Sequence, residues 1–580
     1  MTREKIRRVA ERPHVSGSLG MEHLSAYTLF VLLTCNFLHQ KALGFTYETM
    51  LFSFVLPAAI LLNINQSIGP STQYTWIATS WTLATAVTQT IAGRCSDIFG
   101  RRNFFIAGNI AGLVGCTIGA RASSIDMVIA ATAVMGFGAG LQYLSPAAAC
   151  EIVPRKYRGT VMGFLSIVGI PGSGFGSVIA FAIVRSYTWR WTFYLGMMLN
   201  GVALVLVILF YWPPDFHKLH PEGKTRFQQI KELDFVGLLL FGGGLTTFLV
   251  GISFGGNPYP WKSATVVAPI IIGGTALLIG FPVWEAYGPT NGIKLCPPHV
   301  VKNIRGVVMP LVVGFVAGMA LISLQVFWPQ QVQILYQQDL RQAGWYILSY
   351  NASTTAGCII SGALFAILRK TKYQLIVYVF WSTLFISLMS TVSQNTPARA
   401  IVFVALASFA VGAVQILAIV FVGFGVEDKH IGVAVGLLNT LRSTGGAIAL
   451  SIYSSVFLNK VSKVLVPRIS AAVVQAGLPT TSLQGFIVDL TSGVPPTSVP
   501  GVTPEIIAAG VDAMKSAYSS GFRLLFLTAI AFGLVSCIAV CFVHSVDSHL
   551  TKETAVKVGK LGGRTEAEVL SEKTPAPEDA

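Results

Sequence analysis

Long apolar runs alternate with short polar connections along most of the 580 residues. A helix needs about 20 apolar residues to cross a bilayer. Thirteen runs approach that length, at 73–92, 103–120, 126–150, 159–184, 189–212, 234–254, 264–284, 306–328, 343–367, 374–392, 399–423, 431–457 and 521–543. The pattern therefore predicts an all-α polytopic membrane protein.

The start of the chain allows more than one interpretation. Two shorter apolar runs, Leu24–Leu38 and Met50–Ile64, flank the polar stretch HQKALGFTYE. If they form one crossing, the total is about 14 transmembrane helices and both termini lie in the cytoplasm. Two separate crossings, or an inserted segment around Phe37–Tyr47, are the alternatives. Basic residues gather in the loops that would then be cytoplasmic, which favours one crossing; they include Arg155, Lys156, Arg158, Lys218, Lys224, Arg226, Lys294, Lys302, Arg305, Arg369, Lys370 and Lys372.

Composition supports the membrane assignment and excludes other classes. Charged residues make up 11% and hydrophobic residues 53%, with a mean hydropathy of +0.65, whereas soluble domains carry about 25% charged residues. The net charge of +15 is spread over short loops and a tail, so it predicts no nucleic-acid partner. The eight cysteines lack the paired spacing of a metal site. We expect no metal and no cofactor.

The stretch GRCSDIFGRR at 93–102 places three arginines and one aspartate between two apolar runs. The arginines indicate a cytoplasmic loop. The stretch resembles the loop between the second and third spans of the major facilitator superfamily, with matches at Gly93, Asp97, Gly100, Arg101 and Arg102. The resemblance implies a cytoplasmic gate, in which glycines let helix ends approach and Asp97 pairs with a cation or caps a helix.

The same resemblance implies a major facilitator fold with two six-helix halves related by an internal repeat, plus two inserted helices. A partial second copy of the gate pattern, GALFAILRKTKY, occurs at 362–373. The expected parts are a cytoplasmic arm at 1–23, an N-terminal half at 24–212, a cytoplasmic linker at 213–233, an inserted helix pair at 234–284, a C-terminal half at 285–544 with an external loop at 459–519, and a disordered cytoplasmic tail at 545–580.

The fifth predicted span resembles the superfamily's antiporter motif through Gly169, Pro171, Gly172, Gly174 and Gly176. Ile170 and Phe175 depart from the motif. Proline removes a backbone donor and glycine permits close contact, so we expect a kinked, tightly packed helix. The motif favours antiport over uniport or symport, with simple helix packing as the alternative.

Polar residues within the apolar runs are candidates for a substrate cavity. Arg442 is the charge that lies well inside a late span; it either binds an anionic or oxygen-rich substrate, holds a gate, or reaches the membrane surface. In the fourth span, Thr132 and Met135 stand where proton-coupled drug antiporters carry Arg and Gln, so no proton-coupling residue is assigned. The cavity candidates are Gln142, Tyr143, Gln325, Tyr350, Asn351, Asn439 and Arg442.

Four stretches, VFWPQQVQILYQQD, GNIAGLVGCTIGARA, EIVPRKYRG and GLLNTLRSTGGAIA, resemble the fungal trichothecene-efflux-pump branch, which neighbours the siderophore-iron transporters. The resemblance implies a monomeric, proton-coupled transporter that exports an amphipathic toxin, drug or secondary metabolite across the plasma membrane by alternating access. No phosphate-binding loop motif appears, so this chain's own ATP hydrolysis does not drive transport. Siderophore-iron uptake and a non-transporting receptor are the alternatives. An enzyme is not expected, because no intramembrane cluster of His, Asp and Glu is present.

Overall fold

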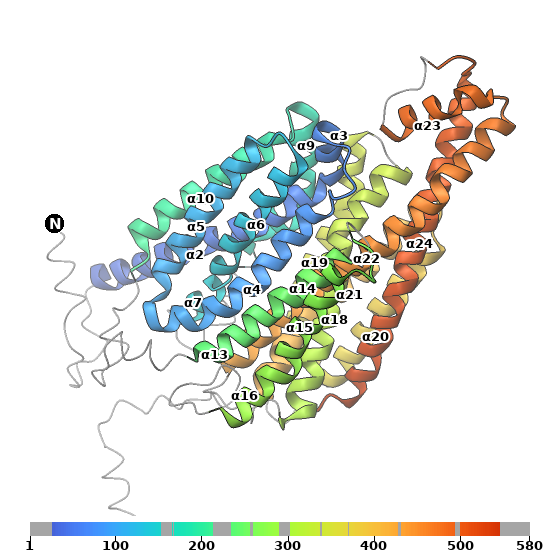
Figure 1. Ribbon diagram of the computed structural model, residues 1–580. Coiled ribbons are helices and arrows are strands. Elements are labelled where there is room, and N and C mark those ends of the chain that lie inside the picture. The colour runs from blue at the N-terminus through green and yellow to red at the C-terminus, as the bar shows by residue number, and fades with distance from the viewer. Residues whose placement is uncertain are drawn as a thin grey trace, which may run out of the picture. The chain divides into compact units, whose positions relative to one another are not determined.

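The structure is a computed structural model that describes residues 26–151, 165, 167–212, 234–255, 259–288, 302–336, 339–368, 370–426, 431–492 and 499–545. The chain forms two compact units, one of residues 1–37 and 551–580 and the other of residues 38–550. All contacts discussed below lie within the second unit. Among the described residues, eleven helices are long and apolar enough to cross a membrane. The structure is helical throughout its main bundle (Figure 1), which agrees with the predicted all-α polytopic membrane class.

The N-terminal helices are α2 (Ala26–Ala59), α3 (Leu61–Ile68), α4 (Trp76–Phe99), α5 (Arg101–Ala120), α6 (Ile125–Gln142), α7 (Ser145–Glu151), the π-helical turn η3 (Ile170–Gly174), α9 (Gly176–Ser186) and α10 (Arg190–Phe210). Helix α2 continues from Ala26 through the polar stretch HQKALGFTYE and ends at Ala59, and α3 begins at Leu61, within the second early apolar run. The two early apolar runs are therefore connected by helix and not by a loop.

The expected inserted pair consists of two further helical segments. They are α13 (Phe235–Leu238), η4 (Leu239–Gly243) and α14 (Gly244–Phe254), followed by α15 (Ala264–Thr275), η5 (Ala276–Gly280) and α16 (Phe281–Tyr287). The Asp234 carboxylate caps α13 by accepting from the Gly237 amide at 2.8 Å. It also accepts from Trp284 Nε1 at 2.8 Å, so one carboxylate joins the start of the first segment to the end of the second.

The C-terminal helices are η6 (Ile304–Val308), α18 (Met309–Gln331), η7 (Val332–Tyr336), α19 (Leu340–Leu368), α20 (Thr371–Leu388), η8 (Met389–Thr391), α21 (Pro397–Phe424), α22 (Ile431–Gln475), η10 (Thr480–Ser482), α23 (Leu483–Ser492) and α24 (Pro504–Phe542). Glycines allow close contact between α19 and α21. The backbone of α19 at Gly357 meets the Phe409 carbonyl of α21, and Gly412 of α21 meets the Thr354 carbonyl of α19. Side chains larger than hydrogen would separate these two helices.

The two ends of the bundle are packed differently. At the end that holds Ile68 and Trp189, called the Trp189 end, one buried cluster contains residues of both the N-terminal and the C-terminal helices, including Ile64, Phe193 and Phe327. At the opposite end, called the Gly100 end, one cluster contains only N-terminal residues such as Phe105, and two others contain only C-terminal residues. Among the described residues, apolar packing therefore joins the two groups mainly at the Trp189 end.

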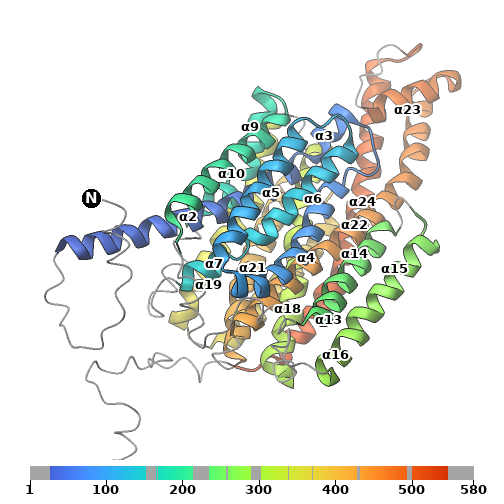
Figure 2. The ribbon, with the colours of Figure 1, turned by 60° about the vertical axis from the view of Figure 1, so that its left-hand side comes forward.

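Helices α22 and α24 are longer than a crossing requires. They span 45 and 39 residues, whereas about 20 residues cross the hydrocarbon. Both continue past the neighbouring helices toward α23 (Figures 1 and 2). The predicted external loop 459–519 is therefore largely helical, because a separate apolar cluster that includes Ile469, Phe486 and Ile506 holds the extensions together.

Candidate functional site

Arg442 on α22 lies where N-terminal and C-terminal helices meet. Its guanidinium donates to Gln415 Oε1 of α21 at 3.3 Å and to the Tyr143 hydroxyl at the end of α6 at 3.5 Å. Tyr47 of α2 lies near Arg442, Tyr143 and Cys358. Four helices, α2, α6, α19 and α21, thus place polar groups around a half-buried cation of α22, and we call Tyr47, Tyr143, Gln415 and Arg442 the Arg442 cluster.

A second polar contact lies close by on the same helix. Gln89 Nε2 of α4 donates to the Ser443 hydroxyl at 2.9 Å and to the Asn439 carbonyl oxygen at 3.1 Å. Asn439 Oδ1 and Gln89 Oε1 have no hydrogen-bond partner among the described residues. The Gln89 amide therefore holds α4 against α22, and the side-chain oxygens of Gln89 and Asn439 remain open acceptors among the described residues.

The Arg442 cluster also has open donors. Gln415 uses its oxygen for Arg442, and its buried Nε2 has no partner within the described part of the chain. Gln325 Nε2 on α18 is likewise buried and unpartnered there. An unpaired buried amide donor costs about 1–3 kcal/mol. A ligand with a hydrogen-bond acceptor beside Arg442 would satisfy Gln415 Nε2.

The remaining cavity candidates are engaged in contacts between helices. Gln142 Nε2 donates to Asn109 Oδ1 at 3.1 Å and to Asn200 Oδ1 at 3.0 Å, within a network of three fully buried amides. The Tyr350 hydroxyl donates to the Leu321 carbonyl at 2.7 Å.

Asn351 also bridges two helices. Its Nδ2 donates to Ser177 Oγ of α9 at 2.8 Å. The structure thus brings Tyr143, Asn439 and Arg442 into one region, whereas Gln142, Tyr350 and Asn351 have partners in neighbouring helices.

The predicted gate loop is mostly helical. Gly93 and the backbone of Asp97 belong to α4, Arg101 begins α5, and Gly100 alone separates the helices. Gly100 has φ of +87°, a left-handed value that glycine adopts without a Cβ clash. The Asp97 side chain lies outside the described part of the structure.

Arg102 connects the gate segment to α10. Its Nη2 donates to the Ile208 carbonyl at 2.8 Å, and its guanidinium lies 3.5 Å from the Trp212 ring centroid. These contacts hold the end of α10 against the start of α5.

Within the antiporter-like motif, Ile170–Gly174 form the π-helical turn η3. An added Cβ at Gly169 would meet Leu51 at 3.1 Å, and one at Gly176 would meet Val55 at 2.7 Å. Both contacts are to α2. Gly174 would meet only Ile170 of its own turn, at 3.5 Å, and Pro171 is exposed.

Glu48 of α2 is a residue that sequence reasoning missed. It is 5% exposed, and its Oε1 accepts a hydrogen bond from the Gly172 amide at 2.6 Å. Its Oε2 is buried without a partner among the described residues. Glu48 belongs to the stretch HQKALGFTYE, which the sequence alone suggests is a polar connection. Its charge becomes a signal of a buried site only once residues 26–59 are known to form one helix.

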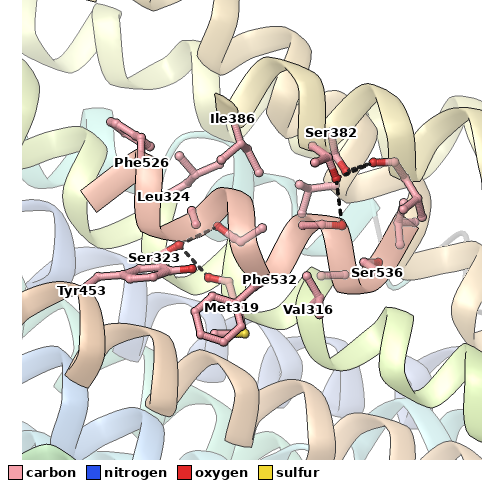
Figure 3. A pocket seen from close by; sticks show the side chains of 18 of the residues that line it. Val316, Met319, Ser323, Leu324, Ser382, Ile386, Tyr453, Phe526, Phe532 and Ser536 are labelled. Atoms are coloured by element: carbon pink, nitrogen blue, oxygen red, sulfur yellow. Dashed lines mark hydrogen bonds between the residues drawn. The ribbon is translucent and has the colours of Figure 1, made fainter. Parts of the chain in front are cut away.

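A cavity lies elsewhere, among α18, α20, α21, α22 and α24 (Figure 3). Its volume is about 40 Å³, and its lining is mostly apolar, with Ser323 and Tyr453 among the polar exceptions. A single water needs about 10–15 Å³ of such volume. The cavity is too small for a drug-sized molecule and contains none of the predicted cavity residues, so the Arg442 cluster is the better candidate site.

Metal binding finds no support in the described residues, which contain no group of three or more His, Cys, Asp or Glu side chains close enough to hold an ion. The described residues bring hydrogen-bonding groups and the positive charge of Arg442 to this region, and Glu48 adds a carboxyl group on α2.

Solved structures of similar fold are membrane transporters. The human organic anion transporter MFSD10 matches with a TM-score of 0.53 at 12% identity, covering 87% of this chain and 99% of that chain. A bacterial homologue of the human lysosomal transporter Spinster, in an inward-facing and unoccupied conformation, matches with a TM-score of 0.54 at 12% identity, over 87% of this chain and 98% of that chain. The fold is that of a major facilitator transporter.

Sequence relatives narrow the class to a family. The family model described as the fungal trichothecene efflux pump matches residues 39–575. A trichothecene efflux pump of Fusarium sporotrichioides is 29% identical over 516 residues, 88% of this chain and 86% of that protein. An efflux transporter of Aspergillus flavipes is 26% identical over 468 residues, 79% of this chain and 78% of that protein. The chain belongs to the fungal trichothecene efflux pump family, and it is a membrane efflux transporter of the major facilitator superfamily.

Proposed function

We propose that this protein exports amphipathic, oxygen-bearing small molecules across the plasma membrane in exchange for protons. The observation that carries the proposal is the Arg442 cluster, a cation beside the open amide donor of Gln415 between the N-terminal and C-terminal helices. Such donors suit epoxide, ester and carbonyl oxygens. Relatives named as trichothecene efflux pumps support this substrate class.

Alternating access is the proposed transport cycle. We take the N-terminal and C-terminal helices as the two six-helix halves, with α13–α16 as the inserted pair and 14 crossings in total. Basic loops then place the Gly100 end and both termini in the cytoplasm. Joint apolar packing at the Trp189 end, with separate clusters at the Gly100 end, supports a state that receives its substrate from the cytoplasm.

Inside-out plasma-membrane vesicles test the proposal directly. A radiolabelled trichothecene should accumulate when the vesicle interior is acidified, and a protonophore should abolish the accumulation. Depletion of ATP at a fixed proton gradient should change nothing. Arg468→Ala is a matched control for Arg442 variants, because Arg468 lies on the same helix but is exposed and bonds to Ser516 and Ser520. Accumulation that persists without a gradient, or uptake of a ferric siderophore by right-side-out vesicles in place of export, would overturn the proposal.

A further inference from the structure

Glu48 is a buried acid on α2. It lies within Lys41–Ala59, a segment apolar enough to cross a membrane. A lone carboxylate in such surroundings is costly, and intramembrane ionisable groups are usually functional. The neighbouring chain offers a single hydrogen bond, from the Gly172 amide at 2.6 Å, and leaves Oε2 without a partner among the described residues.

The partner of Glu48 is informative because it belongs to the interrupted helix. Gly172 lies inside the π-helical turn Ile170–Gly174, where the regular hydrogen-bond ladder is broken. An added Cβ at Gly172 would stand 3.1 Å and 3.2 Å from the two carboxylate oxygens. Glycine therefore lets the carboxyl group approach the backbone, and the contact links α2 to the antiporter-like motif.

Tyr47 is the neighbour of Glu48 on α2. It lies near Tyr143 of α6, Cys358 of α19 and Arg442 of α22. The described residues of η3 contribute no charged side chain. Glu48 is therefore adjacent in the chain to a residue of the Arg442 cluster.

We infer that Glu48 carries the exchanged proton, an inference that rests on the proposed proton-coupled export. A proton from the external side binds the open Oε2 and converts the carboxylate to the neutral acid, and the same proton later leaves to the cytoplasm. The neutral acid accepts the Gly172 hydrogen bond more weakly than the carboxylate does. Protonation therefore loosens the contact between α2 and the interrupted helix and couples proton binding to helix movement.

Vesicle transport by Glu48→Gln, Glu48→Asp and wild type tests this inference. In Glu48→Gln, a pH gradient should no longer accelerate export, and exchange of labelled for unlabelled substrate should persist and become independent of pH. Glu48→Asp should keep part of the acceleration. Glu505→Gln removes an exposed carboxylate at the start of α24 and should match wild type.

The outcomes separate the two proposals. If wild type shows gradient-driven export and Glu48→Gln shows the same acceleration, Glu48 is not the proton carrier, although proton-coupled export stands. If wild type shows no gradient dependence, both proposals fail. If Glu48→Gln does not insert, wild type can be treated with the apolar reagent dicyclohexylcarbodiimide. Labelling of Glu48 that increases at lower pH and blocks gradient-driven export would support the role, and an unlabelled Glu48 would refute it.

Discussion

At the scale of single residues, Arg442 gives the most direct test of substrate recognition. Arg442→Ala removes the donors to Gln415 and Tyr143. A hydrogen bond to a charged group contributes about 1.5–3 kcal/mol, so we expect transport to fall about 10–100-fold. Arg442→Lys keeps the charge but loses the planar fork, and we expect an intermediate rate. Initial export rates normalised to surface expression measure both effects. Wild-type rates in Arg442→Ala would exclude a role in recognition.

Gln142 is expected to act on stability. Its amide joins Asn109 and Asn200, and all three side chains are at most 2% exposed. Gln142→Leu leaves the acceptors without their donor, so we expect a loss of about 1–3 kcal/mol. The thermal midpoint of the detergent-solubilised protein should fall, with substrate selectivity unchanged. Gln475→Leu, at the exposed end of α22, is the control. Altered substrate selectivity at an unchanged thermal midpoint would show that Gln142 contributes to the substrate cavity.

The same residues show what sequence can and cannot predict about the site. Arg442 was recognisable because a charge interrupts a long apolar run. Gln142 and Tyr143 are adjacent in the chain, yet one bonds to amides of α5 and α10 and the other to Arg442. The sequence indicates how far along a membrane helix a residue lies. When every face of the helix is apolar, the sequence does not indicate which face the residue occupies. Glu48 was missed for the opposite reason, because its charged surroundings resemble a loop.

At the scale of elements, the seam between α2 and the fifth span should depend on particular glycines. An added Cβ would meet Val55 at 2.7 Å at Gly176 but only its own turn, at 3.5 Å, at Gly174. Overpacking costs about 1–3 kcal/mol, so Gly176→Ala should lower the thermal midpoint and slow export. Gly174→Ala is the matched comparison and should resemble wild type. Equal effects of the two substitutions would show that the seam does not depend on close approach to α2.

Helix positions were largely predictable, because apolar length alone marks a membrane helix. The structure adds features that depend on contacts between elements. The stretch around Gly100 looks like a polar loop, yet a single left-handed glycine suffices to turn the chain. Likewise, the polar sequence after 459 is helical because Phe486 packs against the extended helices, a contact that local composition does not reveal.

At the scale of the whole molecule, the contacts that join the N-terminal and C-terminal helices at the Trp189 end should break during each transport cycle. The Tyr74 hydroxyl donates to Gln330 Oε1 at 2.9 Å, and it joins the start of α4 to α18. Replacing both residues with cysteine and bridging them with a short bis-maleimide should stop export, because the Trp189 end then stays shut. The single-cysteine variants treated with the same reagent serve as controls. Undiminished export after complete bridging would contradict alternating access through this end.

The extended end of α22 has a mechanical consequence. Arg442 and Gln475 belong to one continuous helix, and 33 residues at 1.5 Å each separate them by about 50 Å. A tilt of about 10° at the level of Arg442 would therefore displace the far end by about 9 Å. The extended ends of α22 and α24 thus amplify movements of these helices within the membrane. A fluorophore attached to these ends, outside the bilayer and remote from the substrate, would report each turnover of a single transporter.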